Sequence, residues 1–112
     1  MKDEILRRNA VEYFQSAEEA LKKDRCNTAV VLFFKSLVSF IDLLLFQKTN
    51  ISPSSHTDRF RETQKQFPEI YDILDRDFPF YQDSYIQTMT KELAEVIKDD
   101  ARFVAEKTGT KI

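Results

Sequence analysis

The chain has 112 residues, of which 42% are hydrophobic and 32% charged, and this length fits one globular domain spanning residues 1–112. One glycine and three prolines argue against a β-sandwich or β-barrel, whose many turns need these residues, and favour an all-α fold. With 17 basic and 19 acidic residues the net charge is −2, so no general attraction to polyanions is expected.

The first predicted helix runs from about Asp3 to Asp24. Its apolar residues recur at three- and four-residue steps, the pattern of a helix with one buried face. The short polar break from Asp24 to Asn27 predicts a second helix that folds back antiparallel on the first, with Asn27 as its N-cap. The residues of the buried stripe are Leu6, Ala10, Tyr13, Phe14, Ala17, Ala20 and Leu21.

The second predicted helix, Thr28 to Gln47, is apolar nearly all round. Such a helix needs a second burying surface, which a central position among several helices or a homodimer interface would provide; the two are compatible. Its run from Ala29 to Phe46 is long enough to span a membrane. Lys35 and Asp42 lie within that run, however, and each costs about 2.5–3.5 kcal/mol at a bilayer centre.

We therefore expect this helix to be a buried helix of a soluble protein rather than a membrane span. Its aromatic and aliphatic residues should form the spine of an antiparallel helical assembly. The N-terminus lacks the apolar stretch of a signal peptide, which predicts a cytoplasmic protein. The residues of the expected spine are Phe33, Phe34, Phe40 and Ile41.

A loop over residues 48–56 separates the second and third predicted helices. Ser55, followed three residues later by Asp58, resembles a capping box that starts the third helix, which continues through Phe67. Pro68 interrupts this helix and can be the first residue of an additional short helix, Glu69 to about Asp75.

The aromatic stretch from Phe78 to Tyr85 has no helical stripe, and we expect an ordered loop there. The last helix can be capped by Thr88 or Thr90, and Gly109 fits the position just past its end. Its predicted apolar face consists of Leu93, Val96, Ile97, Ala101 and Val104.

Several kinds of chemistry have no support in the sequence. His56 is the only histidine and Cys26 the only cysteine, so a zinc site of the usual ligands and an internal disulfide are not expected. The only glycine, Gly109, cannot form a glycine-rich phosphate loop, and no nucleophile elbow is present. We expect neither a metal nor a cofactor.

Four stretches, taken in order, resemble the HEPN domain family. They are Ala10–Leu45, similar to the first two family helices; Ser52–His56, similar to the Pro-x-x-His loop; Leu74–Arg76 with Tyr81, similar to an Arg and Tyr signature; and Thr90–Val104, similar to the closing helix. The resemblance implies an up-and-down antiparallel four-helix bundle, commonly a homodimer, often encoded beside a nucleotidyltransferase in a toxin–antitoxin-like or regulatory pair.

Ribonucleases of this family carry an arginine followed after four to six residues by a histidine. No histidine follows Arg76 in this chain, so the resemblance predicts a non-catalytic binding module. Its inter-subunit cleft, lined by Arg76, Tyr81, Tyr85 and His56, would accept a nucleotide, RNA or a partner nucleotidyltransferase, because guanidinium pairs with phosphate and aromatic faces stack on bases.

Two alternatives stay open from the sequence. The first is a metal-independent ribonuclease with a rearranged site, in which Arg76 stabilises phosphate charge and His56 moves the proton. The second is a helical scaffold that uses its apolar second helix to assemble with another helical protein.

Overall fold

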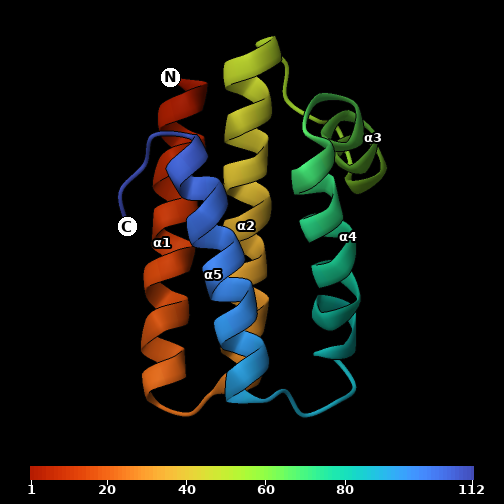
Figure 1. Ribbon diagram of the computed structural model, residues 1–112. Helices are drawn as coiled ribbons and strands as arrows, with labels where there is room; N and C mark the ends of the chain where they lie inside the picture. The colour runs from red at the N-terminus through yellow and green to blue at the C-terminus, as the bar shows by residue number, and fades with distance from the viewer.

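The helical periodicity of the sequence produces five α-helices in the computed structural model, which describes all residues 1–112. They are α1 (Lys2–Lys22), α2 (Cys26–Thr49), α3 (His56–Gln66), α4 (Pro68–Asp83) and α5 (Lys91–Lys107). No strand is present, so the predicted all-α class is confirmed. Figure 1 shows α1 and α4 running in one direction and α2 and α5 in the other. The short helix α3 runs across this direction and is seen nearly end-on.

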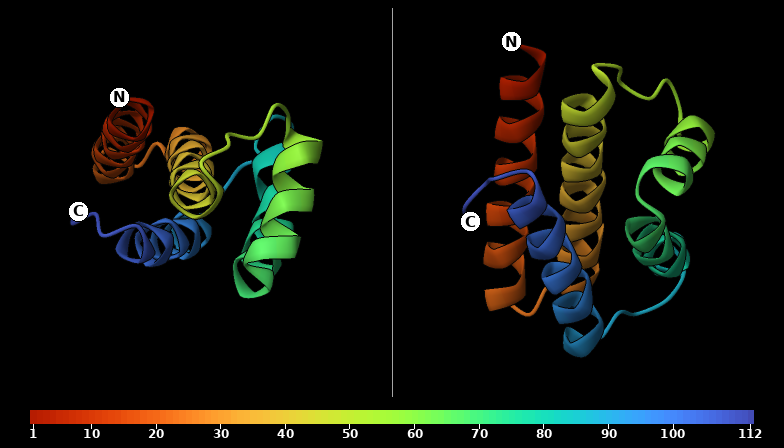
Figure 2. Two further views of the ribbon diagram at one scale, coloured as in Figure 1. Left: turned by 90° about the horizontal axis from the view of Figure 1, so that it is seen from above. Right: turned by 45° about the horizontal axis from the view of Figure 1, so that its top comes forward.

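Helix α2 is the centre of the molecule. Helices α1 and α5 cover one side of it, and α3 and α4 cover the other, as the view from above in Figure 2 shows. The four residues of the predicted spine, Phe33, Phe34, Phe40 and Ile41, are each at most 1% exposed. The second burying surface that this apolar helix needs is therefore supplied by the chain itself.

The burial of α2 also bears on whether this helix spans a membrane. The helix is long and apolar enough to cross a bilayer, but 61% of its most apolar stretch is buried inside the fold. Lys35 and Asp42 lie on its partly covered face, where Asp42 pairs with Arg59 and the Lys35 ammonium lies over the Tyr81 ring. Helix α2 thus has the character of the core helix of a soluble protein, as predicted.

The stripe predicted for α1 is its buried face. Five of its seven residues, Ala10, Phe14, Ala17, Ala20 and Leu21, are buried, and Leu6 and Tyr13 are half-buried. The Phe14 ring meets Phe33 of α2 edge-to-face, with centroids 5.3 Å apart. The small alanine side chains let α1 approach the neighbouring helices closely, so the aromatic pair is enclosed on all sides.

The prediction that Asn27 caps α2 is wrong. Helix α2 begins earlier, at Cys26, and Arg25 occupies the N-cap position. The Asn27 amide instead donates to the carbonyl oxygens of Ser84 and Gln87, at 2.9 and 2.7 Å, and its oxygen accepts from the Met89 amide at 3.0 Å. One side chain thereby satisfies three backbone groups of the loop between α4 and α5.

Because these three bonds anchor the loop, we expect Asn27→Ala to lower the free energy of unfolding by about 2 kcal/mol. Urea denaturation followed by circular dichroism measures this loss. The control is Thr28→Ala, a change at an exposed neighbour in the same helical turn, which should stay within about 0.5 kcal/mol of the wild type. Equal effects of the two substitutions would show that the anchor contributes nothing.

Two further predictions are wrong, the additional short helix over Glu69 to about Asp75 and the ordered loop over Phe78 to Tyr85, because the single helix α4 runs from Pro68 to Asp83 and includes Pro79. The short helix of the fold is α3 instead. Proline has no N–H, so the carbonyl of Asp75 loses its helical partner at this point. Pro79 lies on the exposed side of α4, where water can replace that bond. Phe78 and Tyr81 pack against the core. The free energy gained by burying these side chains compensates for the lost hydrogen bond, so the helix continues beyond the proline.

The predicted helix boundaries elsewhere are mostly confirmed. The Ser55 hydroxyl accepts from the Asp58 amide at 3.1 Å, and the Thr90 hydroxyl accepts from the Leu93 amide at 3.1 Å. Gly109 follows α5 with a φ of +83°, a left-handed conformation that glycine adopts without strain. One residue of the predicted α5 face differs, because Val96 is exposed and Ala94 takes its place in the core.

Candidate functional site

Three of the four predicted site residues gather where α2, α3 and α4 meet. His56 is the first residue of α3, Tyr81 lies in the last turns of α4, and Tyr85 lies just beyond its end. Phe78 connects them, since its ring centroid is 5.9 Å from that of His56 and 6.4 Å from that of Tyr81. The Tyr85 ring then lies 5.7 Å from Tyr81. We call these four side chains, His56, Phe78, Tyr81 and Tyr85, the aromatic row.

The aromatic row rests on the hydrophobic core through Tyr81, and its two ends, His56 and Tyr85, are exposed. The Tyr81 ring stacks on the buried Phe34 ring of α2, with centroids 4.7 Å apart and planes 18° apart. The Tyr81 and Tyr85 hydroxyl oxygens are 3.0 Å apart, and this hydrogen bond, together with burial, raises the pKa of Tyr81. Tyr85 is 72% exposed. The row therefore presents a hydrogen-bonded pair of phenol rings whose outer member is open to a ligand.

Charged side chains of α2 and α3 border the aromatic row. The Lys35 ammonium lies 5.9 Å from the Tyr81 ring centroid and takes part in no salt bridge. Arg59 of α3 forms two bonds to the Asp42 carboxylate of α2, at 2.7 and 2.8 Å. A further nitrogen of Arg59, Nη1, is 2.8 Å from Nδ1 of His56. Lys35 is thus the unpaired cation of the site.

The surroundings of His56 keep its ring neutral. Partial burial lowers its pKa below the usual 6.5, and the positive charges of Arg59 and Lys35 lower it further, while Asp42 acts in the opposite direction. A lowered histidine pKa means that the imidazole carries no charge at neutral pH. His56 can therefore offer a hydrogen bond, but it is not a cation of the site.

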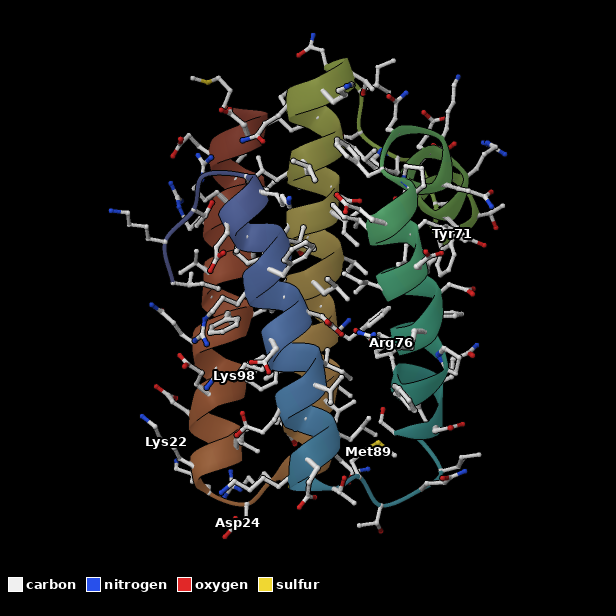
Figure 3. All side chains as sticks on the ribbon, in the orientation of Figure 1. Lys22, Asp24, Tyr71, Arg76, Met89 and Lys98 are labelled. Carbon is white, nitrogen blue, oxygen red and sulfur yellow. The ribbon has the colours of Figure 1, made fainter.

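Arg76, the fourth predicted residue, is not part of the aromatic row. It projects from α4 toward α5, as Figure 3 shows, and pairs there with the Asp100 carboxylate. Its Nε also lies 3.3 Å from the neighbouring Asp77. Burial and the nearby Asp100 raise the pKa of Asp77 to about 8. Arg76 thus belongs to a charged contact between α4 and α5, and Lys35 is the cation that lies beside the tyrosines.

Three polar residues bordering the row, Lys35, Asp42 and Arg59, were not predicted as site residues. Lys35 and Asp42 are the only charged residues within the apolar run of α2 and are seven positions apart, which places them on one helical face. A buried helix retains charges where they have partners, so this spacing is the signal that could have indicated a polar face. Arg59 carries no such signal, because its partner is 17 residues away in the chain.

The rest of the molecule offers no comparable constellation. No group of three or more His, Cys, Asp and Glu side chains could hold a metal ion. A cavity of about 320 Å³ lies between the end of α2, the following loop and α3, and none of the aromatic row lines it. No family model, curated protein or solved structure matches this chain. The aromatic row is therefore the candidate binding site of this protein.

Proposed function

We propose that the protein is a non-catalytic, HEPN-like binding module that takes a nucleotide or single-stranded RNA on the aromatic row. The observation that carries this proposal is the unpaired ammonium of Lys35 beside the Tyr81 and Tyr85 pair. A cation next to an exposed aromatic face binds phosphate and stacks on a base at the same time. Lys35 replaces Arg76 in the binding set, because the Arg76 guanidinium is already bound to the Asp100 carboxylate and to the side chain of Asp77.

The helix arrangement supports the HEPN-like part of the proposal. Helices α1, α2, α4 and α5 are the longer four and alternate in direction along the chain, which suits an up-and-down four-helix bundle, with α3 as the additional short helix. The homodimeric state, a nucleotidyltransferase partner in a toxin–antitoxin-like pair and a cytoplasmic location accompany the resemblance and are part of the same proposal.

The two alternatives receive less support from the observed contacts. A ribonuclease built on Arg76 and His56 needs both groups at one phosphate, yet within the chain Arg76 is held by Asp100 and Asp77, and His56 is held by Arg59. A scaffold that docks through α2 needs that helix exposed, whereas its spine is covered by the other four helices.

The proposal predicts measurable binding of a short labelled oligouridine in a fluorescence anisotropy titration at low salt. Lys35→Gln and Tyr85→Ala should each weaken binding by about tenfold, because each removes a contact of roughly 1–3 kcal/mol. Lys22→Gln, which makes the same charge change on the exposed surface of α1, is the matched control and should leave binding nearly unchanged.

Two outcomes would contradict the binding proposal. One is a wild-type protein that does not bind at low salt, and the other is an equal loss in the Lys22→Gln control. The RNA should also remain intact throughout the titration with a chelator present. Cleavage that disappears in His56→Ala would instead favour the ribonuclease alternative.

A further inference from the structure

The contact between Arg59 and His56 has a chemical consequence for the site. Arginine carries five N–H donors and no acceptor, and its side chain stays protonated. At 2.8 Å from Arg59 Nη1, the Nδ1 atom of His56 must therefore be the acceptor, with an unprotonated lone pair. The single proton of the neutral imidazole is then on Nε2, which faces away from Arg59 and has no partner in the chain.

The position of Arg59 is itself fixed by Asp42. The two bonds between them join α3 to α2, and both side chains are 14% exposed. A bidentate arginine–carboxylate pair prescribes the plane of the guanidinium as well as its place. The other charged group that acts on the imidazole is Lys35 on α2, whose positive charge lowers the pKa of His56, and Tyr81 on α4 is separated from the imidazole by the Phe78 ring.

We propose that Asp42 and Arg59 are positioning residues that hold His56 as its Nε2–H tautomer, so that His56 donates a hydrogen bond to an anionic oxygen of the bound ligand. The ligand half of this inference rests on the proposed function, and the tautomer half stands without it. In this state Nε2 has no lone pair with which to take a proton, so His56 serves in binding rather than as a general base. The site then favours ligands with phosphate oxygens, which accept a hydrogen bond from Nε2–H, over ligands whose polar groups only donate hydrogen bonds.

Nitrogen-15 NMR of the imidazole tests the tautomer directly, and His56 is the only histidine, so its signals need no assignment by mutation. The expected result for the wild type at neutral pH is an unprotonated Nδ1 and a protonated Nε2, with a titration midpoint below 6.5. The opposite tautomer, or a midpoint at or above 6.5, would overturn the inference.

A double variant, Asp42→Leu with Arg59→Met, provides the comparison for that measurement. Removing both charges together avoids the unpaired, largely buried ion that either single change would leave, so the double variant should fold. Without the Arg59 donor, the midpoint should move up toward 6.5 and both tautomers should appear. If the double variant has the wild-type spectrum, Arg59 does not position the ring.

Two substitutions of His56 test the donor role in the oligouridine titration. Glutamine keeps an N–H near the place of Nε2, whereas phenylalanine keeps the ring contact with Phe78 and has no polar atom. His56→Gln should bind within about threefold of the wild type, and His56→Phe should lose about tenfold. Equal losses would overturn the donor role. Absence of wild-type binding would overturn both the donor role and the proposed function, while the NMR result still decides the tautomer.

Discussion

Replacing Asp77 with asparagine is expected to raise the free energy of unfolding by about 2–4 kcal/mol at pH 7 and above. The Asp77 side chain is buried, and its Oδ2 atom has no hydrogen-bond partner. Burial, and then the nearby Asp100 carboxylate, raise its pKa to about 8, although Arg76 acts in the opposite direction. An asparagine is uncharged at every pH, and its amide can donate toward Asp100.

The sign of the pH dependence follows from the raised pKa. Between about pH 4 and pH 8 the folded protein keeps a proton on Asp77 that the unfolded chain has released, so wild-type stability falls as pH rises through this window. Below it both states are protonated and the effect disappears, and above it the loss is complete. The difference in free energy of unfolding between Asp77→Asn and the wild type should accordingly grow from pH 4 to pH 8 and then level off.

Urea denaturation of the wild type and Asp77→Asn at several pH values from 4 to 9 gives the two curves. Asp75→Asn is the matched control, since it removes the same charge from the exposed side of the same helix and should change stability by less than about 0.5 kcal/mol. Parallel pH curves for the wild type and Asp77→Asn would mean that Asp77 titrates normally in the fold.

The parts of the fold that sequence reasoning predicted are those governed by local periodicity and capping. The buried stripe of α1, the caps at Ser55 and Thr90 and the apolar character of α2 each follow from residues within a few positions of one another. The end of α4 does not follow from neighbouring residues, because Pro79 by itself predicts that the helix ends there. The helix continues only because Tyr81 finds Phe34, 47 residues earlier in the chain, as a stacking surface.

The candidate site shows the same difference between features that follow from local sequence and features that depend on contacts between distant residues. His56, Tyr81 and Tyr85 were predicted to act together and lie in one row. Arg76 was grouped with them by its place in the sequence, yet it is five residues before Tyr81 and so lies about 140° around α4, facing α5. The pairing of Asp42 with Arg59 depends on how α3 folds back on α2, which no spacing in the sequence specifies.

Truncating Phe33 to alanine is expected to cost about 3–5 kcal/mol, a large part of the total stability of a domain of this size. Its side chain is 0% exposed, and its ring meets Phe14 at 5.3 Å in the packing between α1 and α2. The cavity left behind would lie between α1 and α2, which form the largest helix–helix contact in the molecule. The whole molecule should therefore lose stability together. The measurement is urea denaturation with circular dichroism, and a loss below about 1 kcal/mol would contradict the central role of this contact.

Phe34→Ala is the informative comparison, because it removes the same number of atoms one residue away, about 100° around α2 and toward α4. Phe34 contacts Phe78 and Tyr81 of α4, whereas α1 and α5 pack on the other side of the helix. Amide hydrogen exchange should therefore show protection lost first in α3 and α4, with α1, α2 and α5 still protected. Oligouridine binding should weaken in parallel, since the Tyr81 stacking surface is gone. Uniform loss of protection in all five helices would instead show that the two sides of α2 unfold as one unit.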